Sequence, residues 1–320
     1  MAAARPVLER MISKHALMNQ ILRVMLAAAV IIPQTTVALR AEPRLESNVI
    51  YGMYSGLALL ADIFHPDQPN GYGIIFVSGS GWHDPTGYDA RPLKDRGQEQ
   101  AYAVPLAKAG YTVFVLNHRA APRFRYPAAV EDVQRAVRFI RHSAGRFGIR
   151  ADRIGAMGGS SGGHLVSLLG TLDGAGDPDD PDPVNRESAK VQCVVARAAP
   201  SDMSAMAGSD GAPHVASFLG APFPDNPTSE EGRRYRKASP VSHISREDAP
   251  FLLLHGDRDK VVPFEQAERM LAALKKAGVA AELLRIPGGE HGPVFGQVKN
   301  PPDYIGTMIE WFNLHLKGKG

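Results

Sequence analysis

The sequence contains a single cysteine, Cys193, so no disulfide can form within the chain. This residue stands in a mostly apolar run and is predicted to be a small buried core residue. The chain also has little excess charge, because 36 Lys and Arg residues against 33 Asp and Glu residues give a formal net charge of +3. Such a balanced chain gives no electrostatic reason to expect nucleic acid as a partner. Hydrophobic residues make up 44% of the 320 residues, enough for one large domain, or at most two.

The N-terminus lacks an apolar run long enough to cross a membrane, but it has the pattern of an export signal. A basic stretch, residues 5–23, precedes the short apolar run 24–32, whereas a membrane span needs ~20 residues. A run of this length suits a signal peptide, and small residues ending at Ala38 or Ala41 suit cleavage. Residues 1–41 are therefore predicted to be a signal peptide or N-terminal leader, and the mature protein to be periplasmic or secreted without a membrane span. The alternative is a cytoplasmic protein with a disordered or misassigned N-terminus.

From about residue 42 onwards, short apolar runs alternate with segments of helical periodicity. Strands are predicted at residues 57–64, 73–77, 111–116, 153–157, 191–196, 251–254 and 281–286. Helices are predicted at residues 98–109, 128–144, 161–169, 264–277 and 305–316. This alternation is typical of the α/β class, in which helices cover both faces of a mostly parallel sheet. Residues 42–320 form one predicted domain, and residues 201–248, which lack a long periodic run, are predicted to pass over the sheet as a lid.

The strongest chemical signal is the segment GGSSGGH at residues 158–164. It follows a predicted strand and opens a predicted helix, the context of a G-x-S-x-G nucleophile elbow. The turn is tight, so the positions two before and two after the serine must lack side chains. Both Ser160 and Ser161 satisfy this rule, each with its own pair of glycines, and spacing alone leaves the register open. The alternative is a glycine-rich turn that only packs tightly or binds phosphate.

A serine hydroxyl is a weak nucleophile unless a base takes its proton and a carboxylate orients that base. The strand at residues 251–254 is followed by Asp257 and Asp259, either of which could orient a base. The strand at residues 281–286 runs into a glycine-rich loop that carries His291. In a mostly parallel sheet, sites form outside the carboxyl ends of the strands, where all these residues stand. The order Ser, Asp, His along the chain is the one that an elbow of this kind expects.

A second turn of small residues, SGSGW at residues 78–82, follows the strand at residues 73–77. Acyl transfer needs backbone N–H donors aimed at the developing oxyanion, and small residues let the backbone approach that closely. A plain glycine turn is the alternative for this segment taken alone.

Residues from about 55 to 316 resemble the α/β-hydrolase superfamily, and in particular bacterial esterases of the hormone-sensitive-lipase-like and feruloyl- and acetyl-esterase-like group. The resemblance rests on RAAPRFRYPAAVED at residues 119–132, on DRIGAMGGSSGGHL at residues 152–165, and on residues 239–263 and 288–292. The last two resemble the SP…HG-x-x-D-x-x-VP and G-x-x-H-G stretches of that group. These motifs are specific in combination.

The resemblance implies an α/β-hydrolase fold and a serine carboxylesterase that acts on carboxylic esters. It implies short acyl groups, on a small molecule or a polysaccharide, and neither cofactor nor metal. The catalytic triad that it implies consists of Ser160 as nucleophile, Asp259 as acid and His291 as base. The oxyanion hole that it implies consists of the backbone N–H groups of Ser80, Gly81 and Ser161.

The chain departs from the family pattern at the second turn, where H-G-G-G-W is replaced by SGSGW. Ser78 stands where the family has histidine, so a hydrogen bond that braces the turn is expected to be lost. Ser80 supplies an N–H group as well as glycine does only if its backbone is unstrained. This departure leaves open a catalytically silent hydrolase fold that binds a ligand or a protein. The triad alone also leaves open a peptidase of the same fold.

Three further features are given ordinary structural interpretations. The acidic loop at residues 177–182 does not have the spacing of an EF-hand and is predicted to be solvated rather than to hold calcium. His164 and His255 flank the motifs and are predicted to pack around the site. Cys193 lies outside the elbow, which argues against a cysteine nucleophile.

Overall fold

The computed structural model describes residues 42–296 and 298–317, and this part of the chain is built on an eight-stranded sheet. Its strands are β1 (Arg44–Tyr54), β2 (Leu57–His65), β3 (Gly73–Val77), β4 (Thr112–Leu116), β5 (Ile154–Gly159), β6 (Cys193–Arg197), β7 (Phe251–Gly256) and β8 (Ala281–Ile286). The order across the sheet is β1-β2-β4-β3-β5-β6-β7-β8. Strands β1 and β2 run antiparallel to their neighbours, and the strands from β4 to β8 are parallel. The mostly parallel sheet predicted from the sequence is confirmed.

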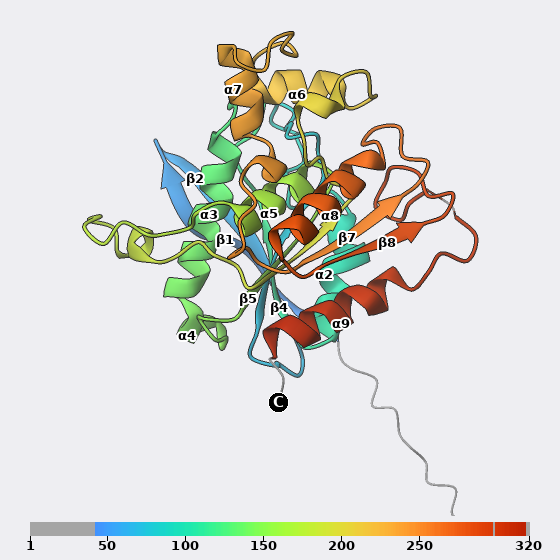
Figure 1. The fold of residues 1–320 in the computed structure, drawn as a ribbon. Coiled ribbons are helices and arrows are strands. Elements are labelled where there is room, and N and C mark those ends of the chain that lie inside the picture. The colour runs from blue at the N-terminus through green and yellow to red at the C-terminus, as the bar shows by residue number, and fades with distance from the viewer. Residues whose placement is uncertain (1–41, 297, 318–320) are drawn as a thin grey trace, which may run out of the picture. The chain divides into compact units, whose positions relative to one another are not determined.

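Along the chain, the helices of the described residues follow β3 and the later strands, and they cover the faces of the sheet (Figure 1). They are α2 (Gln98–Lys108), α3 (Ala128–His142), α4 (Ala144–Phe147), α5 (Ser161–Thr171), α6 (Ala212–Leu219), α7 (Glu230–Lys237), α8 (Glu265–Ala277) and α9 (Tyr304–Leu316). Short 3₁₀ turns are η1 (Pro183–Arg186), η2 (Ser204–Met206) and η3 (Pro240–Ser242). The helix predicted over residues 128–144 ends at His142, because Ser143 leaves the helical conformation before α4 begins.

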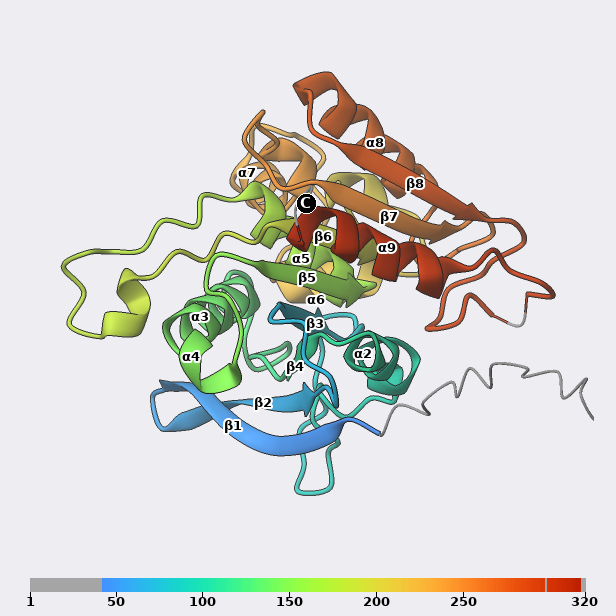
Figure 2. The same cartoon turned by 90° about the horizontal axis from the view of Figure 1, so that it is seen from below.

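Each face of the sheet has its own hydrophobic core, because alternate residues of a strand point to opposite faces. Ile75 and Val77 of β3 join the core beneath α3, α5 and α8. Ile74 and Phe76 join the core beneath α2 and α9. Figure 2 shows α2 and α9 on one side of the sheet and α3 on the other. Burying each such aliphatic or aromatic side chain contributes about 1.5–3 kcal/mol, so the two cores hold the sheet rigid beneath the loops at its edge.

Two features of the fold were not predicted from the sequence. Strand β1 was missed, and α6 and α7 lie within residues 201–248, where no helix was predicted. Figure 1 shows α6 and α7 next to each other at one end of the sheet. Helix α6 docks through Phe218, whose ring stacks on Trp82 at a centroid distance of 4.7 Å. That this segment acts as a lid stays a prediction.

The predicted signal peptide or leader, residues 1–41, lies outside the described residues. Within the described part of the chain, no helix has both the length and the apolar character needed to cross a membrane.

Candidate active site

Ser160 forms the tip of the sharp turn between β5 and α5. Its φ of 53° and ψ of −123° lie in a region of backbone conformation that residues other than glycine rarely adopt. Ser161 is already the first residue of α5. The backbone N–H of Ser160 donates to the carbonyl of Arg197, 2.8 Å away, which ties the turn to β6. The register that the glycine spacing left open therefore has Ser160 at the strained tip.

The glycines on either side of Ser160 lie where a side chain would collide with the backbone. A Cβ on Gly158 would lie 2.3 Å from the carbonyl oxygen of Gly162. A Cβ on Gly162 would lie 2.1 Å from the carbonyl oxygen of Val77, at the end of β3. The spacing rule read from the sequence thus has a steric basis in this chain.

Ser160, His291 and Asp259 form one unbroken chain of hydrogen bonds across three strand ends. Nε2 of His291 lies 3.0 Å from Oγ of Ser160, and Nδ1 lies 2.7 Å from Oδ2 of Asp259. A carboxylate can only accept, so Nδ1 carries the proton and Nε2 is free to accept the serine proton. This arrangement can deprotonate the hydroxyl as the oxygen attacks an electrophile.

Asp259 is held as a carboxylate inside the protein. Burial raises its pKa, but hydrogen bonds from His255 and His291 and the N–H of Val262 outweigh burial and hold the pKa well below its usual value. Its Oδ1 accepts the N–H groups of Val261 and Val262 at 2.9 Å each, which aims Oδ2 at His291. Nε2 of His255 lies 2.9 Å from the carbonyl of Val262 and 3.5 Å from Oδ2 of Asp259, so its main partner is the carbonyl.

Asp257, the other candidate acid, has a different position. It pairs with Arg285 at 2.8 Å and accepts the N–H of Gly288 at 2.7 Å. The hydrogen bond from Arg285 lowers the pKa of Asp257. These contacts anchor the start of the loop that carries His291, and Asp259 contacts the imidazole itself.

The turn after β3, residues 78–82, lies against the nucleophile. A Cβ on Gly79 would lie 2.9 Å from Cβ of Ser160, so only glycine fits at this approach. The N–H of Ser80 donates to Oγ of Ser161 at 2.9 Å, and Gly81 has a φ of 65°. The expected donors Ser80 and Ser161 are therefore neighbours, and the N–H of Ser80 has a side-chain partner in this structure.

Two residues that contact this turn were missed or given no specific role. The side-chain amide of Gln98, the first residue of α2, bonds to both the N–H and the carbonyl of Gly79, at 3.0 and 2.9 Å. Nδ1 of His164 accepts the indole N–H of Trp82 at 3.1 Å, and Nε2 lies 2.7 Å from the carbonyl of Ala238. The position of His164 agrees with its predicted packing role. Nothing in the sequence around Gln98 pointed to a contact with residue 79.

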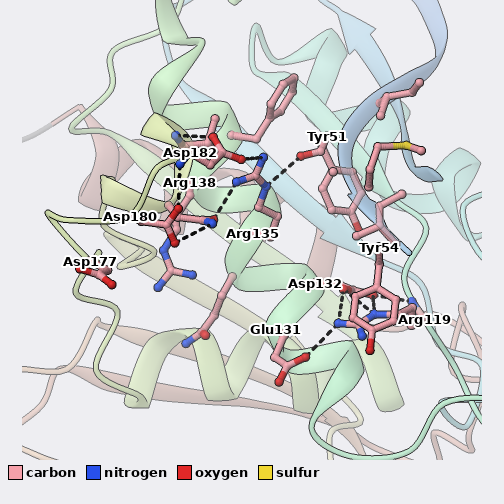
Figure 3. A pocket seen from close by; sticks show the side chains of 18 of the residues that line it. Tyr51, Tyr54, Arg119, Glu131, Asp132, Arg135, Arg138, Asp177, Asp180 and Asp182 are labelled. Atoms are coloured by element: carbon pink, nitrogen blue, oxygen red, sulfur yellow. Dashed lines mark hydrogen bonds and ion pairs between the residues drawn. The ribbon is translucent and has the colours of Figure 1, made fainter. Parts of the chain in front are cut away.

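A separate hollow of about 800 Å³ lies between β1, α3 and the acidic loop (Figure 3). Two of its arginines form ion pairs, Arg119 with Asp132 and Arg135 with Asp182, both at 2.8 Å. Asp180 accepts a hydrogen bond from the side chain of Asn185. Among the residues that the structure describes, no group of three or more His, Cys, Asp or Glu side chains is placed to hold a metal ion. This hollow has no nucleophile with an adjacent base, unlike the elbow.

The family of the chain follows from its sequence match. Residues 61–274 match the BD-FAE family, an esterase family of the α/β-hydrolase fold. This chain belongs to the BD-FAE family. The α/β-hydrolase fold and the esterase relationship predicted from the motifs are confirmed.

Several similar proteins are named as esterases. The chain is 30% identical over 223 residues to Esterase LipC of Mycobacterium tuberculosis, covering 68% of this chain and 52% of LipC. It is 32% identical over 238 residues to Probable carboxylic ester hydrolase LipM of the same organism, covering 72% and 52%. The chain thus spans about half the length of these curated relatives. A solved structure, a truncated carbohydrate esterase from gut microbiota, superposes with a TM-score of 0.72 at 27% identity, covering 88% of this chain and 99% of that one.

Proposed function

We propose that this protein is a serine hydrolase that cleaves carboxylic esters through an acyl-enzyme on Ser160. The observation that carries the proposal is the unbroken hydrogen-bonded chain from Asp259 through His291 to Ser160. The similarity to Esterase LipC and to Probable carboxylic ester hydrolase LipM supports the same class of reaction.

In the acylation step, Oγ of Ser160 attacks the ester carbonyl carbon while Nε2 of His291 accepts the hydroxyl proton. The carbonyl π electrons move onto its oxygen and give a tetrahedral oxyanion. When the oxyanion collapses, the bond to the alcohol oxygen breaks and His291 returns the proton to that oxygen. Asp259 stays ionised throughout and stabilises the imidazolium that forms in between.

In the deacylation step, water takes the place of the alcohol. His291 accepts a proton from water as the water oxygen attacks the acyl carbon, and the acid leaves as Oγ of Ser160 regains its proton. Backbone N–H groups of Ser80, Gly81 and Ser161 stabilise the oxyanion in both steps. Without substrate, the N–H of Ser80 donates to Oγ of Ser161, and during the reaction it donates to the oxyanion instead.

The substrates are short acyl esters, from acetyl to butyryl, carried on a small molecule or a polysaccharide. The sequence contains no long apolar insertion that would build a slot for a lipid chain. The likeness to a carbohydrate esterase supports a sugar as the alcohol part. The leader-like residues 1–41 support export, where such a polysaccharide would be met.

The test combines a fluorophosphonate probe with a panel of substrates. The wild-type protein should be labelled, the Ser160→Ala protein should not, and rates on p-nitrophenyl esters should fall as the acyl chain lengthens. Acetylated xylan, feruloyl esters and aminoacyl amides complete the panel. Faster turnover of aminoacyl amides than of any ester would point to a peptidase instead. Absence of both labelling and turnover would point to a binding protein and overturn the proposal.

A further inference from the structure

The side chain of Gln98 grips the peptide backbone at the start of the turn after β3. Its Oε1 accepts the N–H of Gly79 at 3.0 Å, and its Nε2 donates to the carbonyl of Gly79 at 2.9 Å. A backbone N–H can only donate and a carbonyl can only accept, so the partner must offer an acceptor and a donor side by side. A side-chain amide meets this requirement, whereas a carboxylate or a thioether does not.

The second of these bonds fixes the direction of the neighbouring N–H group. The carbonyl of Gly79 and the N–H of Ser80 belong to one planar trans peptide unit, in which they point in opposite directions. Because Gln98 draws the carbonyl to its own side, the N–H of Ser80 points to the other side. There it meets Oγ of Ser161, 2.9 Å away, beside the nucleophile.

Apart from Gln98, this peptide unit is held by the hydrogen bond from the N–H of Ser80 to Oγ of Ser161. Turning this unit over changes ψ of Gly79 and φ of Ser80, and Gly79 has no side chain to restrict its part of the rotation. Within the described residues, the buried hydroxyls of Ser78 and Ser80 have no hydrogen-bond partner, so neither braces the turn. A flipped unit would aim a carbonyl oxygen at the nucleophile instead of an N–H group.

We infer that Gln98 is a positioning residue that orients the oxyanion donor of Ser80 through the Gly79–Ser80 peptide unit. The inference rests on the proposed function, because it concerns the oxyanion hole of that reaction. Gln98 takes over the bracing role that the sequence suggested was lost with the histidine at position 78.

The experiment compares Gln98→Met and Gln98→Glu with Gln100→Met and Gln100→Glu. Gln100 is exposed and lies two residues further along the same helix. In Gln98→Met, kcat should fall about 10- to 100-fold with little change in KM. Removing one donor from an oxyanion hole lowers kcat by ~100-fold, and a donor that points the wrong way should cost up to that much. The inhibition constant of a trifluoromethyl ketone, whose adduct places an oxyanion in the hole, should rise by the same factor. The Gln100 variants should match the wild type.

Gln98→Glu gives a test based on pH, because a residue that only supported the fold would not change the pH dependence of kcat. An ionised carboxylate repels the Gly79 carbonyl, whereas a protonated one can both accept and donate as the amide does. The ratio of its kcat to that of the wild type should therefore rise about tenfold between pH 8 and pH 5, as the pH approaches the ~4.3 at which glutamate titrates. This variant has the shape of glutamine and carries the test if Gln98→Met does not fold.

Two results would overturn the inference, and they are distinguishable. Gln98 variants with the kinetics and the trifluoromethyl ketone affinity of the Gln100 variants would overturn it and leave the proposed function intact. A wild-type protein that neither hydrolyses esters nor reacts with the fluorophosphonate would overturn the proposed function and the inference with it.

Discussion

Two turns rich in glycine and serine follow β3 and β5, which are neighbours in the sheet, and they are held in different ways. The turn after β5 is fixed by backbone packing, because Gly158 lies against the carbonyl of Gly162, and Gly162 lies against that of Val77 in β3, with no room for a side chain. The turn after β3 is fixed from outside, because Gln98 of a separate helix bonds to Gly79. Similar compositions thus give one turn that is held by backbone packing and one that depends on a side chain 19 residues away in the sequence.

This difference has a functional meaning. The nucleophile must stand in a strained conformation, and only close packing on all sides maintains strain. An oxyanion donor does not need a strained backbone, but its N–H bond must point at the oxyanion. One hydrogen bond from a well-placed side chain is enough to orient it. Substitutions in the first turn should therefore affect chemistry or folding strongly, and most substitutions in the second should affect rate alone.

The largest effect is expected at the tip of the first turn. Ser160→Ala should lower kcat by about 10⁴-fold or more, as removal of a triad nucleophile does. The protein should remain folded, because alanine loses only a hydroxyl whose partner is His291. Hydrolysis of p-nitrophenyl acetate checks the rate and circular dichroism checks the fold. If Ser160→Ala stays active while Ser161→Ala is dead, the register is wrong by one residue.

A second prediction tests whether packing determines the first turn. A Cβ at position 162 would lie 2.1 Å from the backbone oxygen of Val77, so Gly162→Ala should lower the free energy of unfolding by about 3 kcal/mol through overpacking. Gly145→Ala is the matched control, because nothing lies within 4 Å of its Cβ position. It should leave stability unchanged or raise it by up to ~1 kcal/mol. Urea unfolding measures both, and equal stability of the two variants would contradict a steric lock.

A third prediction concerns His164, which joins the two turns through Trp82. Burial lowers its pKa to about 4, against the hydrogen bond to the Ala238 carbonyl, which raises it. Indole only donates, so Nδ1 must stay unprotonated to accept from Trp82. The unfolded chain binds this proton first as pH falls, because its histidine titrates near ~6.5. The contribution of neutral His164 to the free energy of unfolding is therefore fully present above pH ~6.5. As the pH falls towards 4, the free energy of unfolding decreases by on the order of 3 kcal/mol.

His164→Gln tests this linkage, because an amide can accept from Trp82 and donate to Ala238 without titrating. The free energy of unfolding should fall less steeply between pH 6.5 and pH 4 in the variant than in the wild type. Urea unfolding at several pH values measures how the free energy of unfolding changes with pH in each protein. The other histidines contribute equally to both slopes, so the difference between the slopes reports on His164. Parallel slopes would show that protonation of His164 does not affect folding.

The smallest effect is expected where the two turns meet. Ser161→Ala removes the acceptor of the Ser80 N–H but keeps the backbone N–H of residue 161, so kcat should stay within about threefold of the wild type. Ser78→Ala is the control in the other turn, because the buried hydroxyl has no partner in the described residues. A loss of more than tenfold in Ser161→Ala alone would mean that this hydroxyl, and not Gln98 by itself, directs the Ser80 donor.

The parts of the fold that the sequence predicted are those with regular local patterns. Strands β2 to β8 and the longer helices carry the periodicity of strand or helix over enough residues to be recognised. Strand β1 was missed because two irregularities in its pairing with β2, after Glu46 and after Ile50, interrupt the alternation of its buried residues. Helices α6 and α7 were missed because eight residues are too few for a clear stripe. The lid and the signal peptide stay predictions.

By itself, the sequence determined the strand–turn–helix context of the elbow, the need for glycines around it, and the order of serine, aspartate and histidine along the chain. The first two are local properties, because each depends on residues within a few positions of one another, and the third is read directly from the order of the motifs. The resemblance to a known family had favoured Ser160 over Ser161 and Asp259 over Asp257, where spacing alone left both pairs open. The tertiary structure supplies the contacts at Ser160 and Asp259 and decides how the turn after β3 is braced. Such contacts join side chains from different strands and helices, and their partners become neighbours only once both cores have packed. No local pattern could have identified Gln98, because its partner is a backbone group that every residue carries.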